Sequence, residues 1–386
     1  MRVAPEFDDP LLPAGARLYR VGGAVRDQLL GLPVGEQDWV LTGVDAADML
    51  AAGFTQVGRD FPVFLHPQSH AEYALARTER KRGRGYHGFL VHADPSVSLE
   101  QDLARRDLTI NAIAENHDGR LIDPWGGCQD LARRYLRPVS DAFVEDPLRL
   151  LRLARFAARF AHLGFKSHPD SHVVCQQIVA SGELRDLAVE RVWQETLRAM
   201  GSAHPERYLT LLAHWGALDQ VFSPRFAELY QLNEATTAAL LRAMTARTGD
   251  GSIRFLAALL AMRADQALIE ELANQLKWSR SQTILARRAL ASPEQPPIQP
   301  EAVLQWFNQI DLWRSPSALE THLLLQRVVA AWPQEISNRL RSSALAALSV
   351  RAEQALAKGL RGPEVGQAIE QMRARQVAAS MAGFSD

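Results

Sequence analysis

The fold is set by two stretches near the N-terminus, LYRVGGAVRD at residues 18–27 and EQDWVL at residues 36–41. In the first, the short run of residues 18–21 predicts a strand, and the glycine pair after it predicts a tight turn. Residues 25–30 then predict a helix that ends at Gly31. In the second stretch, two acidic residues lead directly into another predicted strand. Strands and helices alternating in this way predict a domain of mixed α and β structure.

Further short elements continue the pattern, and a different pattern then replaces it. The expected strands or other short elements are residues 63–66, 73–76 and 108–114, and the expected helix is residues 46–52. From Glu145 onward the sequence has helical periodicity, with a proline-rich break at residues 292–300. The fold class is therefore predicted to be α+β, with a small mixed β-sheet in residues 1–138 and an all-helical remainder.

The composition excludes several classes of protein. The chain has 386 residues, 47% of them hydrophobic, and a net charge of −1 from 43 Lys and Arg against 44 Asp and Glu. This balance argues against disorder and against histone-like, non-specific nucleic-acid binding. The N-terminus has no apolar signal region, and the longest clean apolar run, residues 255–262, is too short to span a membrane. A soluble cytoplasmic protein is expected, without a membrane partner; Cys128 and Cys175 are too few for a disulfide framework.

The glycine turn is the first candidate for chemistry. Gly22 and Gly23 allow close backbone approach where a helix begins, and Arg26 adds a cation, which together suit a phosphate group. The alternative is a simple tight turn, because neither the P-loop ending nor the dinucleotide fingerprint is present.

Three acidic residues form the second candidate. Glu36 and Asp38 are two residues apart at the start of a strand, so their side chains point to the same face. Glu72 precedes what we expect to be a neighbouring strand. Taken alone, the pair reads most simply as a charged turn. With Glu72 and the glycine turn beside it, it suggests a two-metal nucleotidyl-transfer site, because carboxylate oxygens suit Mg²⁺.

Arginines form the third candidate. On the helix predicted to follow Asp146, the residues Arg149, Arg152, Arg155 and Arg159 fall within an arc of roughly 120°. A solvated helix face more commonly alternates acids and bases, and this stripe has no acidic residue at the i+4 spacing. A groove that holds an anion and an ordinary solvated face remain equal alternatives here.

Two other basic segments add weaker signals. Residues 77–85 form a loop rich in arginine that either contacts phosphate or RNA or is merely solvated. Arg106, with Asn111 five residues later, lines the same pocket or belongs to a surface patch.

These motifs, in this order and spacing, resemble bacterial class II tRNA nucleotidyltransferases, the CCA-adding enzymes of the polymerase β superfamily. The resemblance rests on VGGAVRD from Val21, the acid pair before Trp39, RRDLTINA at 105–112 and EDPLR at 145–149, with a looser match at 359–365. It implies a five-stranded catalytic head at 1–138, a neck that recognises the nucleotide base at 139–200, a body at 201–292 and a tail at 300–386 that binds tRNA. It also implies template-independent addition of C, C and A to tRNA 3′ ends from CTP and ATP, with Mg²⁺ or Mn²⁺. The sequence leaves the oligomeric state open.

The resemblance assigns roles by position. Glu36 and Asp38 would hold the metals, with Glu72 as the third catalytic acid. The nucleotide-binding residues it implies are Gly22, Gly23, Arg26, Arg106, Asn111, Asp146, Arg149, Arg152 and Arg155.

Base selection has a physical basis of its own. Cytosine and adenine share an exocyclic amino group beside a ring nitrogen, so an aspartate accepts from the first while an arginine donates to the second. Guanine and uracil place a carbonyl oxygen against the aspartate. Asp146 with Arg149 fits this task, although a helix N-cap would explain Asp146 equally well.

Two departures from the family pattern qualify the expectation. Glu36 stands where relatives usually have Asp, which extends the carboxylate by about 1.5 Å. A catalytically silent tRNA-binding module is therefore one alternative, and an A-adding, poly(A)-polymerase-like enzyme is another. No His-Asp dipeptide follows Asp118, so we expect the form without an HD phosphohydrolase domain.

Overall fold

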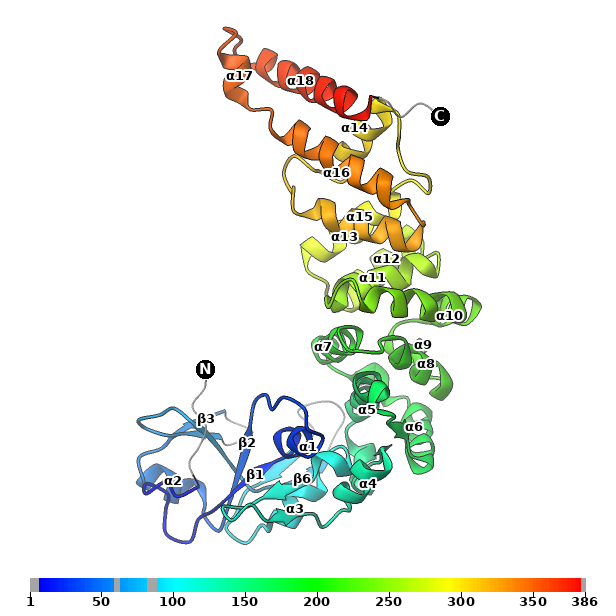
Figure 1. Cartoon of the computed structure of the whole chain (residues 1–386). Coiled ribbons are helices and arrows are strands. Elements are labelled where there is room, and N and C mark those ends of the chain that lie inside the picture. Colours follow the sequence, from blue (N-terminus) through cyan, green and yellow to red (C-terminus); the bar gives the residue numbers. More distant parts are fainter. Residues whose placement is uncertain (1–6, 59–62, 82–88, 383–386) are drawn as a thin grey trace. The chain divides into compact units, whose positions relative to one another are not determined.

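A computed structural model describes residues 7–58, 63–81 and 89–382 (Figure 1). The chain divides into two compact units, the first ending at Val221 and the second beginning at Phe222. Each unit is described by itself. The finer division predicted at residues 138, 200 and 292 stays a prediction.

The first unit begins with a mixed sheet of seven strands in the order β3-β4-β5-β2-β1-β8-β9. The strands are β1 (Arg17–Val21), β2 (Asp38–Thr42), β3 (Thr55–Val57), β4 (Val63–Leu65), β5 (Glu72–Leu75), β8 (Ala114–Glu115) and β9 (Leu121–Ile122). The neighbours β2 and β5 are parallel, and the other pairs are antiparallel. The α+β class is confirmed. The expected number of five strands was too low, because β8 and β9 have only two residues each.

Alternating side chains bury both faces of this sheet. On one face, Trp39 and Leu41 pack with Tyr73 and with Met49 of α2 (Ala46–Ala51). The other face carries Val21, Val40, Ala76 and Ala114, which pack with Leu103 of α3 (Leu99–Ala104). This alternation follows from the two-residue period of a strand.

Capping side chains define where the first helices begin. Asp45 and Asp48 form a reciprocal capping box at α2, and Ser98 and Gln101 form another at α3. These side chains satisfy backbone N–H groups that have no partner within the helix. The helix α1 (Gly23–Leu29) begins in the glycine turn instead, without a side-chain cap.

Helices dominate the rest of the first unit, as expected. They are α4 (Gly127–Arg133), α5 (Leu148–Phe160), α6 (Pro169–Ser181), α7 (Val189–Met200), α8 (Glu206–Trp215) and α9 (Leu218–Val221). The apolar side of α5 packs against α7 and α8.

The first unit also contains two small two-stranded sheets. They are the hairpin of β6 (Thr78–Lys81) with β7 (Phe89–His92), and the parallel pair of β10 (Tyr135–Leu136) with β11 (Lys166–Ser167). The segment 108–114 forms a 3₁₀ turn at Thr109–Asn111 before β8.

The second unit is wholly helical among its described residues, and successive helices stack on one another (Figure 1). They are α10 (Pro224–Thr245), α11 (Gly251–Ala261), α12 (Gln266–Gln275), α13 (Arg280–Ala291), α14 (Pro300–Gln309), α15 (Ala318–Val329), α16 (Gln334–Leu348), α17 (Ala352–Leu356) and α18 (Pro363–Met381). The proline-rich segment separates α13 from α14, as expected. In the described ranges, no helix is both long and apolar enough to cross a membrane.

Gly127 allows α4 to lie directly against the turn that precedes β8. A Cβ atom at this position would lie 2.2 Å from the Thr109 carbonyl oxygen and 2.7 Å from Cγ1 of Ile113. Such distances force the backbone apart, because the nearest atoms belong to main chain and to a buried core side chain.

Gly127→Ala should therefore lower the free energy of unfolding by about 3 kcal/mol, the upper end of the usual cost of overpacking. Urea unfolding followed by circular dichroism measures it. Gly366→Ala is the matched control, since a Cβ atom there meets nothing within 4 Å. Equal stability of the Gly127 variant and the wild type would contradict the close packing described here.

Candidate active site

Strand register brings three of the predicted residues to one end of the sheet. Asp38 pairs with Val21, so it lies beside the glycine turn that follows β1. In the parallel pair of β2 and β5, Val40 is opposite Ala74, and two residues earlier on each strand are Asp38 and Glu72. Residues two apart share a face, and neighbouring strands are about 4.8 Å apart. The two carboxylates therefore start from adjacent positions on the same face.

The turn itself requires glycine. Gly22 has φ 71° and ψ −127°, a conformation that L-residues rarely adopt. A Cβ atom on Gly22 would lie 2.7 Å from Nη1 of Arg106 and 3.8 Å from Oδ2 of Asp38. The Gly22 N–H donates to the Ile113 carbonyl at 3.0 Å, which ties the turn to the segment before β8. Backbone, arginine and carboxylate thus meet at one point.

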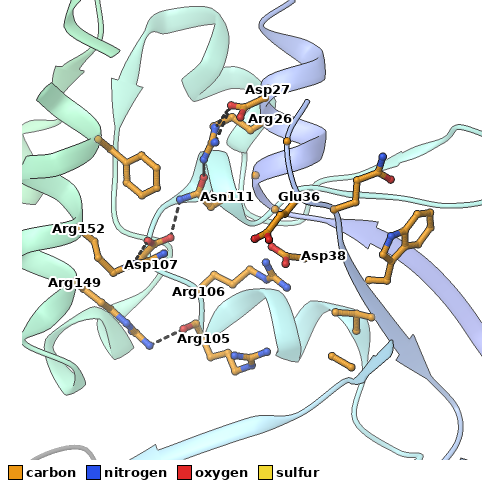
Figure 2. A pocket seen from close by; sticks show the side chains of 18 of the residues that line it. Arg26, Asp27, Glu36, Asp38, Arg105, Arg106, Asp107, Asn111, Arg149 and Arg152 are labelled. Carbon is orange, nitrogen blue, oxygen red and sulfur yellow. Dashed lines mark hydrogen bonds and ion pairs between the residues drawn. The ribbon is translucent and has the colours of Figure 1, made fainter. Parts of the chain in front are cut away.

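A cavity of about 850 Å³ opens at this end of the sheet, lined by residues of the sheet, α1, α5 and α7 and by the segment that follows α3 (Figure 2). Every site residue predicted from the sequence lies on its wall. They are Gly22, Gly23, Arg26, Glu36, Asp38, Glu72, Arg106, Asn111, Asp146, Arg149, Arg152 and Arg155. The structure thus brings them together in one place, and their individual roles are taken up below as proposals.

The acid pair faces the cavity. Figure 2 shows the carboxylates of Glu36 and Asp38 pointing toward one another beside the Arg106 guanidinium, and both residues are exposed. Glu72 is also exposed on the cavity wall. Within the described ranges, however, no three acidic, histidine or cysteine side chains are close enough together to hold one metal ion. The arrangement offers two carboxylate ligands rather than three.

The arginine stripe of α5 is paired with acids from other elements. Arg152 Nε donates to Asp107 at 2.7 Å, Arg155 Nε to Glu195 at 2.5 Å, and Arg159 Nη2 to Asp27 of α1 at 2.9 Å. The absence of acids at i+4 on the helix therefore did not mean unpaired arginines. The arginine stripe lines the cavity, and acids from other elements neutralise most of its positive charge.

Asp107 is the most firmly held of these acids. It is 6% exposed, and it accepts hydrogen bonds from Asn111 Nδ2, from the Leu108 N–H and from Arg152. Burial alone would raise the pKa of this carboxyl, but the charge of Arg152 and these hydrogen bonds outweigh burial and hold its pKa well below the usual range. The same pairing raises the pKa of Arg152.

Asp146 lies directly before α5, one residue ahead of the N-cap position, which is Pro147 rather than Asp146. Its Oδ1 accepts from the N–H of Leu148, the first residue of α5, at 3.1 Å, and its Oδ2 accepts from Arg191 at 3.2 Å. It lines the cavity as well. Arg149 is 7% exposed and donates to the carbonyl oxygens of Ala142 and Arg105. Burial lowers the pKa of Arg149, although nearby acids oppose that effect.

Arg26, the candidate phosphate-binding arginine, is almost completely enclosed. It is 3% exposed, donates to Asp27 at 2.8 Å and to Asn111 Oδ1, and packs over the rings of Phe156 and Phe160. Burial lowers its pKa despite the adjacent carboxylate. Arg26 thus links α1, α5 and the turn at Asn111 on the cavity wall.

Sequence reasoning missed the acids that pair with the stripe. Asp27, Asp107 and Glu195 are far from their partners along the chain, and Arg155 and Glu195, for example, are 40 residues apart. The one available signal for Asp107 was its place in the RRD motif. Arg77 of the basic loop lines the cavity, whereas Arg82 and Arg84 lie outside the described residues.

A mixed sheet with a glycine turn, a carboxylate pair and an arginine-lined cavity defines the nucleotidyltransferase class of polymerase head domains. Residues 18–137 match the family described as the poly A polymerase head domain, and residues 164–229 match the "probable RNA and SrmB- binding site of polymerase A". The chain is 43% identical to the CCA-adding enzyme of Marinobacter nauticus, covering 93% of this chain and 97% of the relative. It is 42% identical to the multifunctional CCA protein of Halorhodospira halophila, covering 93% and 96%. The chain belongs to the family of CCA-adding enzymes.

Solved structures show the same fold. The Bacillus stearothermophilus CCA-adding enzyme in complex with CTP superposes with a TM-score of 0.68 at 24% identity, covering 98% of this chain and 94% of that one. The Thermotoga maritima CCA-adding enzyme complexed with tRNA gives a TM-score of 0.63 at 20% identity, covering 100% and 94%.

The lowered pKa of Asp107 predicts how its replacement changes the free energy of unfolding. Asp107→Asn should destabilise the protein by about 2 kcal/mol at pH 7, because it leaves Arg152 without its charged partner. A carboxyl whose pKa is lowered in the folded state stabilises the fold fully at pH values above its unfolded pKa of about 3.9. That stabilisation is lost as the pH falls toward the folded pKa.

The difference between wild type and Asp107→Asn should thus be constant from pH 7 to 5 and shrink at pH 3. Urea unfolding at the three pH values measures it. Asp118→Asn, at an exposed turn, is the control. A difference that grows on acidification would show that the ion pair does not stabilise the fold.

Proposed function

We propose that this cavity adds C, C and A, without a template, to the 3′ end of tRNA, using CTP and ATP and releasing pyrophosphate. The observation that carries the proposal is the strand register that joins the glycine turn, Asp38 and Glu72 in one cavity with the arginines of α5. Relatives named for CCA addition, at 42–43% identity over nearly the full chain, support it.

The donor set fits a hard divalent cation. Glu36 and Asp38 direct two carboxylates at one another, an arrangement that is repulsive unless a cation lies between them. Mg²⁺ commonly binds through one or two carboxylates and completes its shell with water and substrate phosphate oxygens. Bound there, Mg²⁺ or Mn²⁺ would stabilise negative charge at the reacting phosphate. Glu72 is assigned the role of third acid on the same wall.

The reaction breaks the phosphoanhydride bond between the α- and β-phosphates of the nucleotide and forms a phosphodiester bond to the tRNA. The 3′-hydroxyl oxygen of the tRNA bonds to the α-phosphorus of the nucleotide, its proton leaves to solvent, and the bond to the bridging oxygen breaks to release pyrophosphate. The backbone of Gly22 and Gly23 with Arg106 faces the triphosphate, and Arg26 and Asn111 complete that wall. These groups orient the α-phosphate for attack in line with the leaving group.

Asp146 and Arg149 are assigned to base selection. Asp146 accepts from the exocyclic amino group of cytosine or adenine, and Arg149 donates to the neighbouring ring nitrogen. Both side chains are held in advance, Asp146 by the start of α5 and by Arg191, and Arg149 by two backbone carbonyls. Arg152 and Arg155 stand next to them along α5. Fixed donors and acceptors discriminate better than mobile ones because a wrong base leaves them unpaired.

The direct test is incorporation of nucleotide. Purified protein incubated with tRNA lacking its 3′ end, labelled CTP and ATP, and Mg²⁺ or Mn²⁺ should extend the tRNA by three nucleotides, resolved on a sequencing gel. Use of ATP alone would indicate an A-adding enzyme. Tight tRNA binding without extension under either metal, and without rescue by Glu36→Asp, would establish the silent module instead.

The metal assignment has its own test. Asp38→Ala should reduce extension at least about 10³-fold, because it removes one of the two ligands that organise the transferred phosphate. It should leave tRNA affinity, measured by filter binding, within twofold or so of the wild type. Asp118→Ala in the same unit is the control and should retain activity. An active Asp38 variant would place the metals elsewhere.

A further inference from the structure

Glu195 of α7 is a buried acid that the proposed reaction does not use. It is 3% exposed. Its Oε2 accepts from Arg155 Nε at 2.5 Å, and its Oε1 lies 3.8 Å from Arg152 Nη1 and 3.6 Å from Arg198 Nη1. All three arginines line the cavity. The Glu195 carboxylate therefore lies near three cations of the cavity wall, two from α5 and one, Arg198, from its own helix.

The contacts determine which nitrogen of each guanidinium is held by an acid. Arg155 and Arg152 both use Nε for their hydrogen bonds to acids, Arg155 to Glu195 and Arg152 to Asp107. A guanidinium fixed through Nε still has its two terminal nitrogens for a second partner. Arg155 is further restrained by packing 4.2 Å over the ring of Phe156. Terminal nitrogens held in a fixed plane are suited to phosphate oxygens and to base edges.

Arg149, in contrast, is oriented without any acid. Its Nη1 and Nη2 donate to two backbone carbonyls, from Ala142 and Arg105. The stripe thus contains two kinds of arginine: Arg149 is oriented by main chain, and the other three are oriented by buried carboxylates. Of those three, Arg155 is held directly by Glu195 and Arg152 also lies near it, so Glu195 affects the cavity without lining it.

We propose that Glu195 is a positioning residue for nucleotide binding, which acts through Arg155 and Arg152 and makes no contact with the nucleotide. The proposal rests on the function proposed above. The ligand chemistry is that of a nucleoside triphosphate, whose phosphates and base edge accept hydrogen bonds from guanidinium groups.

Electrostatics alone predicts the opposite effect of neutralising Glu195. Removing one negative charge beside a cavity for a triphosphate makes the cavity more positive and strengthens anion binding. Loss of positioning weakens anion binding. The NH₂ group of a glutamine cannot accept a hydrogen bond from Arg152 or Arg198, so these side chains become free to rotate. The sign of the change therefore separates a positioning residue from a counter-charge.

The experiment compares Glu195→Gln with wild type in the intact chain. We expect Kd for CTP and ATP, measured by equilibrium dialysis, and the KM for both to rise about tenfold, since hydrogen bonds to charged groups contribute at this scale. The kcat and the Kd for tRNA should stay close to wild type, whereas the thermal midpoint should fall, because Arg155 loses its charged partner as Arg152 does in Asp107→Asn. Glu206→Gln is the matched control, because Glu206 is also a buried glutamate of the first unit but pairs with His204, away from the cavity wall.

A double-mutant cycle tests whether Glu195 acts through Arg155. Arg155→Gln should weaken nucleotide binding, and adding Glu195→Gln to it should have little further effect. Glu195→Asp, which keeps the charge, should recover part of the lost affinity, and it keeps the test open if the Gln variant folds poorly. Tighter nucleotide binding by Glu195→Gln, or fully additive effects in the cycle, would overturn the proposal.

The two proposals fail in different ways. If wild type binds CTP but extends no tRNA, the proposed reaction is wrong and the binding measurements still test Glu195. If wild type extends tRNA and Glu195→Gln matches it in Kd and KM, the reaction stands and the role of Glu195 is refuted. A fall in thermal midpoint and kcat with unchanged nucleotide Kd would assign Glu195 to the fold alone.

Discussion

Parallel pairing of β2 with β5, beside antiparallel β1, is the constraint on which the site depends. It aligns the first residue of each parallel strand, so Asp38 and Glu72 start from neighbouring positions at the end of the sheet where the Gly22 turn lies. A slip of one residue would move every side chain of the strand to the opposite face. The buried residues Trp39 and Val40, on opposite faces, prevent that slip. Core packing thus fixes where the carboxylates point.

Charge compensation is the second organising feature. The cavity wall carries many arginines, which would repel one another if each were isolated. Asp27, Asp107 and Glu195 pair with three arginines of α5 and are themselves buried. Buried pairs of this kind contribute modestly to net stability but impose geometry, because each partner is costly to leave alone. The cavity therefore keeps ordered cationic groups without an excess of unbalanced charge, and it can receive an anion without first rearranging.

The residues proposed to read the base are also part of the local structure. Asp146 accepts from the first N–H of α5 and lines the cavity, and Arg149 donates to the backbone carbonyls of Arg105 and Ala142. The helix that presents the arginines and the aspartate proposed to read the base are consequently one rigid piece. Side chains at a helix terminus are held in position more accurately than side chains on a free loop.

Local patterns were enough to predict the α+β class, the strands at residues 18–21 and 39–41 and the helix after Asp146, because these depend on short-range periodicity and spacing. The full set of twelve residues that share one cavity wall came from the resemblance to the CCA-adding family. Only the tertiary structure decided which acids pair with the arginine stripe. It also decided that Arg26 is enclosed by Asp27, Asn111 and two aromatic rings. In the described residues, it brings two facing carboxylates rather than three to the potential metal site. Those contacts join residues far apart along the chain, and their distances follow from how sheet and helices pack rather than from any neighbouring sequence.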